Sequence, residues 1–370
     1  MFPREGRRAG AGVKTEGRLL GATLARILAG AWRPDPPALS LSAQDAAASV
    51  PYLLRTGAAG QAWWRVRRSE AATLPAAHQL QQAFRLQALH AAIRQVAVAE
   101  AATLLRRVGV EAVLGKGWAI ARQYPDLALR PYGDIDLYVP EAEHRKAADL
   151  IENTKAGPID LHRGFAELDD RHASDLLARS RLVELDGVPV RIFGEEDHLR
   201  LLALHLLRHG GYRPLWLCDI AVALETRSDR FDWDVFLGGS ARRSRWAVCA
   251  LLLAQRLLGA SMLDVPAEIT GQRLPRWLLT AVLDRWSSSS FVPQGMRAPM
   301  RSYVRTPLAG LRALLGRWPN GIEATVGLGG AFNDLPRLPF QVAECVRRAA
   351  GFLRSVRAVD FRGRRPQPSV

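Results

Sequence analysis

The sequence has few of the residues that form cross-links or membrane segments. Its three cysteines, Cys218, Cys249 and Cys345, are far apart and lack metal-ligand spacing, which excludes a disulfide framework and is typical of a reduced cytoplasm. No uninterrupted apolar run approaches the roughly 18 residues that a membrane span needs. Arg26 interrupts the apolar stretch 19–30, which favours an amphipathic helix over a signal peptide. We therefore expect a cytoplasmic protein without a transmembrane segment.

Acidic residues are also scarce relative to basic ones. The 370 residues include 51 Lys and Arg against 36 Asp and Glu, a net charge of +15. The excess lies at the ends, with +5 in residues 1–33 and +9 in residues 291–370, which leaves +1 between them. Two interpretations stay open. The basic ends could contact an anionic partner such as tRNA or a membrane surface, or they could be solvated arginine-rich tails.

The hydrophobic pattern divides the chain into five segments. They are a basic N-terminal segment (1–40), N-terminal helices (41–110) with a long helix over 76–107, a catalytic core with a sheet (111–193), a helical domain (194–290) and a basic, partly disordered C-terminal segment (291–370) with a last helix over 341–356. Asp186-Gly187 predicts the turn of a hairpin over 182–192. Asp197 can cap a helix that ends at His209.

The most informative motif lies at residues 134–136. Apolar residues at 135, 137 and 139 alternate with Asp134, Asp136 and Tyr138, which predicts a half-buried strand. The two aspartates then share one face, roughly 6–7 Å apart. At that distance two like charges repel by about 2–3 kcal/mol for an effective dielectric constant of 20. A cation between them removes this repulsion, and Mg²⁺ is a natural candidate because it binds carboxylates and substrate phosphates.

Two further features support a phosphate-handling site. Gly115-Lys116-Gly117 stands between a short apolar run at 111–114 and a helical stretch at 118–124, and a strand, glycine turn and helix N-terminus together can bind an anion. Downstream, Asp160 and His162 share one face of a second predicted strand. If that strand neighbours the first, three carboxylates converge, which is the usual requirement of two-metal phosphoryl transfer.

These motifs resemble a bacterial nucleotidyltransferase family of the DNA polymerase β-like superfamily. The resemblance is carried by LGKG at 114–117, YPD at 124–126, RPYGDIDL at 130–137 and IDLH at 159–162, and the stretches 201–209 and 215–220 resemble the helical half of that family. It covers residues 75–260. It implies an α/β (α+β) fold, a minimal nucleotidyltransferase mixed sheet flanked by helices, with a C-terminal α-helical bundle.

The resemblance also implies an activity. A nucleoside monophosphate would pass from an NTP to an acceptor hydroxyl, with release of pyrophosphate and with two Mg²⁺ ions as cofactors. By match to the motif, Asp134 and Asp136 would hold the metals. Asp160 would complete the catalytic metal site and help to activate the acceptor hydroxyl.

The turn at 115–117 would bind the triphosphate. Gly115 and Gly117 would let the backbone approach it, and Lys116 and Arg130 would neutralise phosphate charge. One position departs from the family pattern, because many superfamily members carry a serine directly after the glycine pair and this chain has Trp118. Either Lys116 substitutes for the serine or triphosphate binding is weakened. Trp118 also lies where a base could stack.

Several alternatives stay open. The acceptor could be a small molecule, a peptide, a protein or a tRNA. The basic ends favour a tRNA-modifying relative similar to nucleotidyltransferase toxins, and Trp118 favours an inactive nucleotide-binding or scaffold protein of the same fold. His205 and His209 share a helix face, which suggests core histidines more than a zinc pair, because no third ligand is evident.

Overall fold

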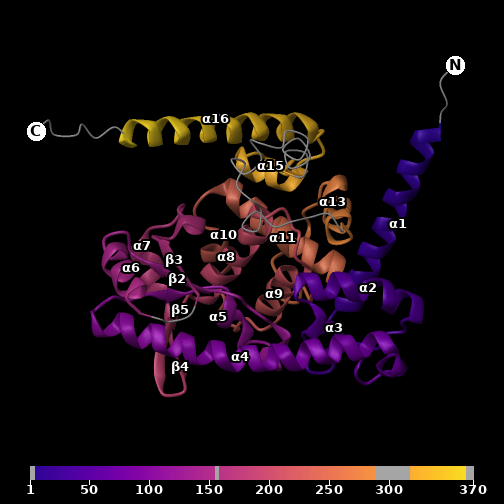
Figure 1. Cartoon of the computed structure of the whole chain (residues 1–370), viewed down its shortest axis with the longest axis horizontal. Coiled ribbons are helices and arrows are strands. Elements are labelled where there is room, and N and C mark those ends of the chain that lie inside the picture. Colours follow the sequence, from indigo (N-terminus) through magenta and orange to yellow (C-terminus); the bar gives the residue numbers. More distant parts are fainter. Residues whose placement is uncertain (1–4, 155–157, 289–316, 364–370) are drawn as a thin grey trace, which may run out of the picture.

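The computed structural model of the chain describes residues 5–154, 158–288 and 317–363. It shows an α+β fold in which a five-stranded mixed sheet is flanked by helices (Figure 1). This confirms the fold class that the sequence predicts. Within the described ranges, no helix combines the length and the apolar character that crossing a bilayer requires.

The sheet is built from short strands in the order β3-β2-β1-β5-β4. β2 and β3 are parallel, β1 is antiparallel to β2 and parallel to β5, and β4 and β5 are antiparallel. The bounds are β1 Val113–Leu114, β2 Ile135–Val139, β3 Ile159–Arg163, β4 Arg181–Leu185 and β5 Val188–Ile192. The predicted hairpin is therefore confirmed. Its turn residues Asp186 and Gly187 have φ of 49° and 79°, as a two-residue hairpin loop of type I′ requires.

Among the residues that the structure describes, four helices precede the sheet in the sequence. They are α1 Glu5–Leu28, α2 Ala43–Thr56, α3 Ala59–Val66 and α4 Pro75–Arg107, with the 3₁₀ turn η1 Glu70–Thr73 before α4. The long helix predicted at 76–107 is confirmed as α4. It begins with a proline at its first turn, where the missing N–H is not needed. Figure 1 shows α4 running past both the sheet and α3.

Short helices connect the strands, and longer ones form the second half of the molecule. The connecting elements are α5 Gly117–Ala121, η2 Leu127–Leu129, α6 His144–Glu152, η3 Ala166–Leu168 and α7 Ala173–Arg179. The second half contains α8 Glu195–Arg208, α9 Pro214–Glu225, α10 Trp233–Leu237, α11 Ala241–Leu258, α12 Ala267–Thr270, α13 Arg276–Trp286, α15 Gly321–Gly327 and α16 Leu338–Gly363. The helices from α8 to α13 lie in the segment 194–290, where the sequence predicts helices, whereas α15 lies in the C-terminal segment and was not predicted.

Apolar side chains form two buried clusters. The larger one joins α1–α3 to the helices α8, α9, α11 and α13, with Leu28, Leu207, Leu251 and Trp286 among its fully buried members. The smaller one fills the space between α4 and the sheet and includes Leu105, Leu114 and Leu137. The face of β2 that carries residues 135, 137 and 139 therefore packs toward α4. The opposite face of β2 is left for the polar side chains.

Two sequence expectations need correction or restriction. Asp197 does not cap α8, because Gly194 is the N-cap residue. Asp197 lies inside the first turn, fully buried, and accepts hydrogen bonds from Arg171 and Arg179. In the C-terminal segment, the helix predicted at 341–356 is longer, Leu338–Gly363. The predicted disorder concerns the C-terminal end, residues 362–370. Arg362 and Gly363 belong to α16 instead, and residues 364–370 lie outside the described residues.

Candidate active site

A cleft of about 1210 Å³ opens where β2 and β3 meet the helical half. The polar face of the two strands contributes to it together with the turn before α5, and α8, α9, α11, α15 and α16 contribute the remaining side chains. The residues of the predicted site that line it are Lys116, Gly117, Arg130, Asp134, Asp136 and Asp160.

The register of β2 and β3 brings Asp136 and Asp160 side by side. The parallel strands pair Asp136 with Asp160 and Tyr138 with His162. Because side chains alternate along a strand, these four occupy one face of the sheet. Two carboxylates that are far apart in the sequence therefore meet in the cleft. Their role as metal ligands remains a prediction.

His162 binds both of these carboxylates. Its Nε2 lies 2.9 Å from Asp136 Oδ1 and 3.4 Å from Asp160 Oδ2. Its ring stacks on the buried Tyr138 ring at a centroid distance of 4.2 Å. Ligand atoms of Asp136, Asp160 and His162 all lie within 4.8 Å of one another. Asp134, exposed just before β2, lines the same cleft but is not part of this close group.

The glycine turn directs Lys116 toward the carboxylates. A side chain at Gly115 would begin 2.8 Å from the Tyr138 ring, so only glycine fits behind the strand. Lys116 then has φ of 47°, a strained conformation for a residue with a side chain. Its Nζ lies 2.6 Å from Asp136 Oδ1 and 3.6 Å from Glu167 Oε1. The ammonium group thus pairs with carboxylates, and its contact with phosphate remains a prediction.

Glu167 is a site residue that sequence reasoning missed. It lies in η3, is buried and accepts a hydrogen bond from Tyr138 Oη at 2.9 Å. It lines the cleft beside Lys116 and His205. Its only local signal is Gly164, which turns the chain after β3 with φ of 66°, and a single glycine does not mark an acid three residues later as part of a site.

The electrostatics of this group keep its acids charged. Burial raises the pKa of Asp136, but the hydrogen bond with His162 and the charge of Lys116 outweigh burial and leave the pKa below its usual value. Burial likewise raises the pKa of Glu167, and the hydrogen bond with His205 and the charge of Lys116 lower it further than burial raises it. Both carboxylates are therefore anionic near neutral pH.

His205 and His209 contribute an aromatic part of the lining. His205 Nδ1 lies 3.4 Å from Glu167 Oε1, and both imidazoles lie against Trp216, at centroid distances of 4.5 and 5.2 Å. Burial lowers the pKa of His209 to about 3, with the His205 ring beside it as a second cause. Within the part of the chain that the structure describes, the possible metal-ligand group is Asp136, Asp160 and His162, so the two helix histidines belong to no such group.

Arg130 faces the cleft but is held by another residue. Its guanidinium pairs with the fully buried Asp219, with Nη2 2.7 Å from Oδ2 and Nε 3.1 Å from each carboxylate oxygen. Tyr124 Oη donates to the same carboxylate at 2.9 Å. This pairing fixes the segment before β2 to α9. The predicted contact of Arg130 with phosphate is untested.

Trp118 does not stand where the sequence suggested. It is only 4% exposed and packs in the apolar cluster between α4 and the sheet. The expectation that it stacks on a base is therefore wrong for this arrangement. The reason is that α5 turns its first residues into the core instead of along the cleft.

Arginines line a further part of the cleft. Arg208 at the end of α8 and Arg242 at the start of α11 are exposed. Arg243 pairs with Asp169, and Arg347 and Arg348 of α16 pair with Glu344 at 2.6 and 2.7 Å. Basic residues from the C-terminal segment therefore reach the site.

The donor set fits a divalent cation. Two carboxylates and an imidazole lie within 4.8 Å of one another, and Asp134 lines the same cleft. Hard cations such as Mg²⁺ prefer the carboxylate oxygens of this set, whereas imidazole nitrogen is a ligand that transition-metal ions prefer. A cation here would also offset the repulsion between adjacent carboxylates, a role that Lys116 and His162 fill in this structure.

A comparison with known proteins identifies the family of this chain. The model of a family described as uncharacterised nucleotidyltransferase matches residues 43–157 and 154–259, more than half of the chain. A similar solved structure is that of an antigenic nucleotidyltransferase-like protein from Paracoccidioides brasiliensis, with a TM-score of 0.35, 16% identity, and coverage of 48% of this chain and 96% of that one. No curated protein matches the chain.

Proposed function

The chain belongs to the uncharacterised nucleotidyltransferase family, and on that premise we propose that it transfers a nucleoside monophosphate from an NTP to an acceptor hydroxyl with Mg²⁺ as cofactor. The observation that supports this most is the in-register pair Asp136 and Asp160 in a large polar cleft. Two adjacent anionic side chains are costly unless a cation joins them. Phosphoryl-transfer sites use such carboxylates to hold metal ions.

Each residue of the site has a role in this proposal. Asp136 and Asp160 hold the metal, and Asp134 completes the set from the mouth of the cleft. When bound, the metal would offset the negative charge of the triphosphate and of the leaving pyrophosphate. His162 contacts both carboxylates and so fixes their orientation. Lys116 offsets the negative charge of Asp136 and is itself part of the turn that would bind the triphosphate.

The reaction balances without a further reagent. The acceptor oxygen forms a bond to the α-phosphorus, the bond from that phosphorus to the β-bridging oxygen breaks, and pyrophosphate leaves in line. The hydroxyl proton passes to a carboxylate such as Asp160 and then to water. Asp160 suits this step because its side chain is 54% exposed.

The proposal is tested by the transfer of labelled nucleotide to an acceptor, with pyrophosphate release by the purified chain as a second readout. Each of the four NTPs, labelled at the α-phosphate, is incubated with the full chain, Mg²⁺ and a lysate of the source cell. We expect label to enter one class of acceptor, and Asp136→Asn to abolish the transfer. Asp149→Asn, an exposed acid on α6, should leave it unchanged. Nucleotide binding without any pyrophosphate release would instead identify an inactive nucleotide-binding protein.

A specific observation favours an anionic acceptor such as tRNA. Arg208 and Arg242 are exposed in the cleft, and Arg243 and Arg347 stand beside them. Cationic side chains along the path to a site attract polyanions. The measurement is the affinity for total tRNA across a salt series. A steep loss of affinity with salt supports this acceptor class, and a slope near zero excludes it.

A further inference from the structure

The helix α4 carries an apolar stripe on its solvent side. Leu86, Leu89, Ile93 and Val96 are each between 54% and 58% exposed. Their spacing of three, four and three residues places them on one face, in the a and d positions of a heptad. Single exposed apolar residues are ordinary, but four large ones in a row on one helix face mark a contact surface.

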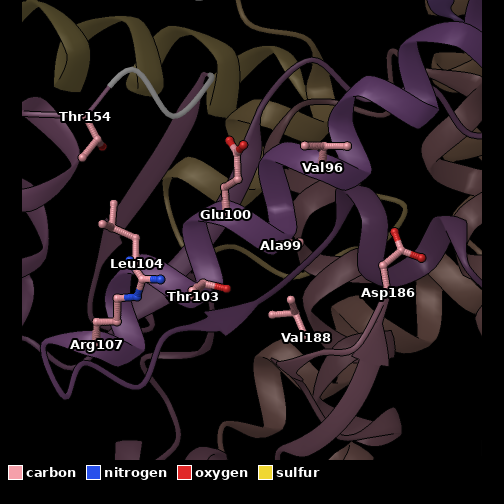
Figure 2. A pocket seen from close by; sticks show the side chains of 9 residues that line it. All are labelled: Val96, Ala99, Glu100, Thr103, Leu104, Arg107, Thr154, Asp186 and Val188. Atoms are coloured by element: carbon pink, nitrogen blue, oxygen red, sulfur yellow. The ribbon is translucent and has the colours of Figure 1, made fainter.

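A hollow adjoins the C-terminal half of the same helix. It has a volume of about 640 Å³ and is lined by Val96, Glu100 and Thr103 of α4 and by Asp186 and Val188 of the β4–β5 hairpin (Figure 2). The stripe begins before this hollow and runs into it. A single surface therefore combines an exposed apolar stripe with an adjoining recess that both apolar and polar side chains line.

We propose that α4 pairs antiparallel with α4 of a second copy of this chain, about a twofold axis near residue 91. In antiparallel helix pairs, a positions of one helix face d positions of the other. Leu86 then faces Val96 of the second copy, and Leu89 faces Ile93 of the second copy. The twofold axis repeats both contacts, which gives four layers that are all apolar.

The same register fits the hollow. Residues of one α4 that precede Leu86, such as Gln82, lie beside Glu100 and the hollow of the second copy. The hollow of each copy thus receives the segment of α4 that precedes the stripe of the other copy, and only Leu86 of the stripe reaches its edge at Val96. Such an interface uses the same patch twice and closes as a dimer, without a free surface for further growth.

Charge selects the antiparallel orientation. Glu100 is the one acidic residue in α4, and it occupies an a position of the stripe. In a parallel pair it would face Glu100 of the second copy. In the antiparallel pair it lies one turn from Arg85 of the second copy, which is exposed on the same side of the helix. Two complementary contacts replace one repulsive contact.

Dimerisation through α4 leaves the cleft open. Figure 1 shows α4 and α16 on opposite sides of the molecule, and Arg347 and Arg348 of α16 line the cleft. The interface is therefore independent of the proposed activity.

Sedimentation velocity of the full chain over a wide concentration range tests the dimer. We expect a dimer for the wild type and a dimer at least about 100-fold weaker for Ile93→Glu. The twofold axis places this substitution in two of the four apolar layers, because each glutamate faces Leu89 of the other copy. Leu263→Glu, at a residue 72% exposed on another surface, should remain dimeric. Circular dichroism checks that both variants are folded. A wild type that stays monomeric, or a dimer that Ile93→Glu leaves intact, overturns the proposal.

Cysteine cross-linking tests the register. Leu86→Cys and Val96→Cys are made separately in a Cys345→Ser background, because Cys345 is the partly exposed native thiol. Oxidation of the two variants mixed in equal amounts should give a disulfide between positions 86 and 96, identified by peptide mass spectrometry. Disulfides between two copies of position 86, or no cross-link at all, would contradict the antiparallel pairing.

Discussion

Two buried carboxylates, Asp136 and Asp219, show how the molecule separates structural charges from reactive ones. Asp219 is fully enclosed and accepts hydrogen bonds from Tyr124 and Arg130. Asp136 is also buried and is bound by Lys116 and His162. The two sites therefore do not differ in burial or in the presence of a cationic partner.

They differ in their second neighbour. Asp219 is paired with the guanidinium of Arg130 and accepts a hydrogen bond from Tyr124, so its charge is offset within the chain. Asp136 stands in register with a second carboxylate, Asp160, whose side chain is 54% exposed to the cleft. An arrangement that places two acids together at an opening costs free energy in the absence of a cation. An open pair of acids, rather than a buried acid as such, therefore marks the candidate active site.

The largest expected effect is on activity at Asp136. Asp136→Asn removes a proposed metal ligand and should lower the rate of pyrophosphate release by about 1,000-fold, equivalent to about 4 kcal/mol in the activation barrier. The fold should survive, because asparagine keeps an acceptor for Lys116. Steady-state kinetics and a thermal melt measure the two effects. Normal activity of Asp136→Asn would show that the reaction does not need Asp136, and the proposed difference between Asp136 and Asp219 would then be wrong.

The converse effect is expected at Asp219. Asp219→Ala leaves the buried guanidinium of Arg130 without its partner, and removing one member of a buried ion pair costs about 3–5 kcal/mol of unfolding free energy. The control is Asp284→Ala, which breaks an exposed pair with Arg18 and should cost less than about 1 kcal/mol. Urea unfolding compares them. Similar losses of unfolding free energy for the two variants would show that the buried Arg130–Asp219 pair stabilises the fold no more than an exposed pair does.

A smaller effect is expected for His198, a third buried polar residue behind the site. Its Nε2 accepts the Lys116 N–H at 3.2 Å, and burial, with Arg130 and Arg122 as further causes, lowers its pKa from 6.5 to about 3. The unfolded chain thus binds more protons between pH 6.5 and 3, so stability is complete above pH 6.5 and declines as the pH falls.

This group should account for about 2 kcal/mol of the stability lost between pH 8 and pH 5. His198→Gln should flatten the pH dependence of urea unfolding by that amount, even though the variant is less stable at pH 8. The exposed His90 provides the control variant, His90→Gln. An unchanged slope in His198→Gln would mean that His198 takes up a proton over the same pH range in the folded and in the unfolded protein.

The smallest expected effect concerns the arginines of the cleft. Arg242→Ala should reduce the slope of log affinity for tRNA against log salt by about one, because a single phosphate contact is lost. Unlike the variants above, it should change neither stability nor basal pyrophosphate release. Arg245→Ala, an exposed arginine on the same helix that does not line the cleft, is the matched control. Equal slopes for Arg242→Ala and Arg245→Ala would show that tRNA does not bind in the cleft.

Local patterns in the sequence predicted the parts of the fold that depend on neighbouring residues. Alternation located the strand with Asp136, the Asp186-Gly187 turn located the hairpin, and an unbroken helical stretch located α4. Each of these rests on a period or a turn that acts within a few residues. Alternation also placed Asp160 and His162 on one face of their strand, but the pairing of that strand with β2, which brings Asp160 beside Asp136, was only a condition of the prediction.

Contacts between distant segments could not be predicted. Nothing near Glu167 indicates that it would reach Lys116, and nothing near Arg347 indicates that α16 would line the cleft. The inward turn of Trp118 and the pairing of Arg130 with Asp219 were likewise set by packing between elements. Such contacts leave no periodic trace in a single sequence.

Mn²⁺ binding, followed by electron paramagnetic resonance, measures whether Asp136 and Asp160 jointly hold a divalent cation. Mn²⁺ reports on the site whether or not the acceptor is known. We predict binding to the wild type and to Asp149→Asn with equal affinity, and at least about tenfold weaker binding to Asp160→Asn. Equal affinity of the wild type and Asp160→Asn would contradict the account.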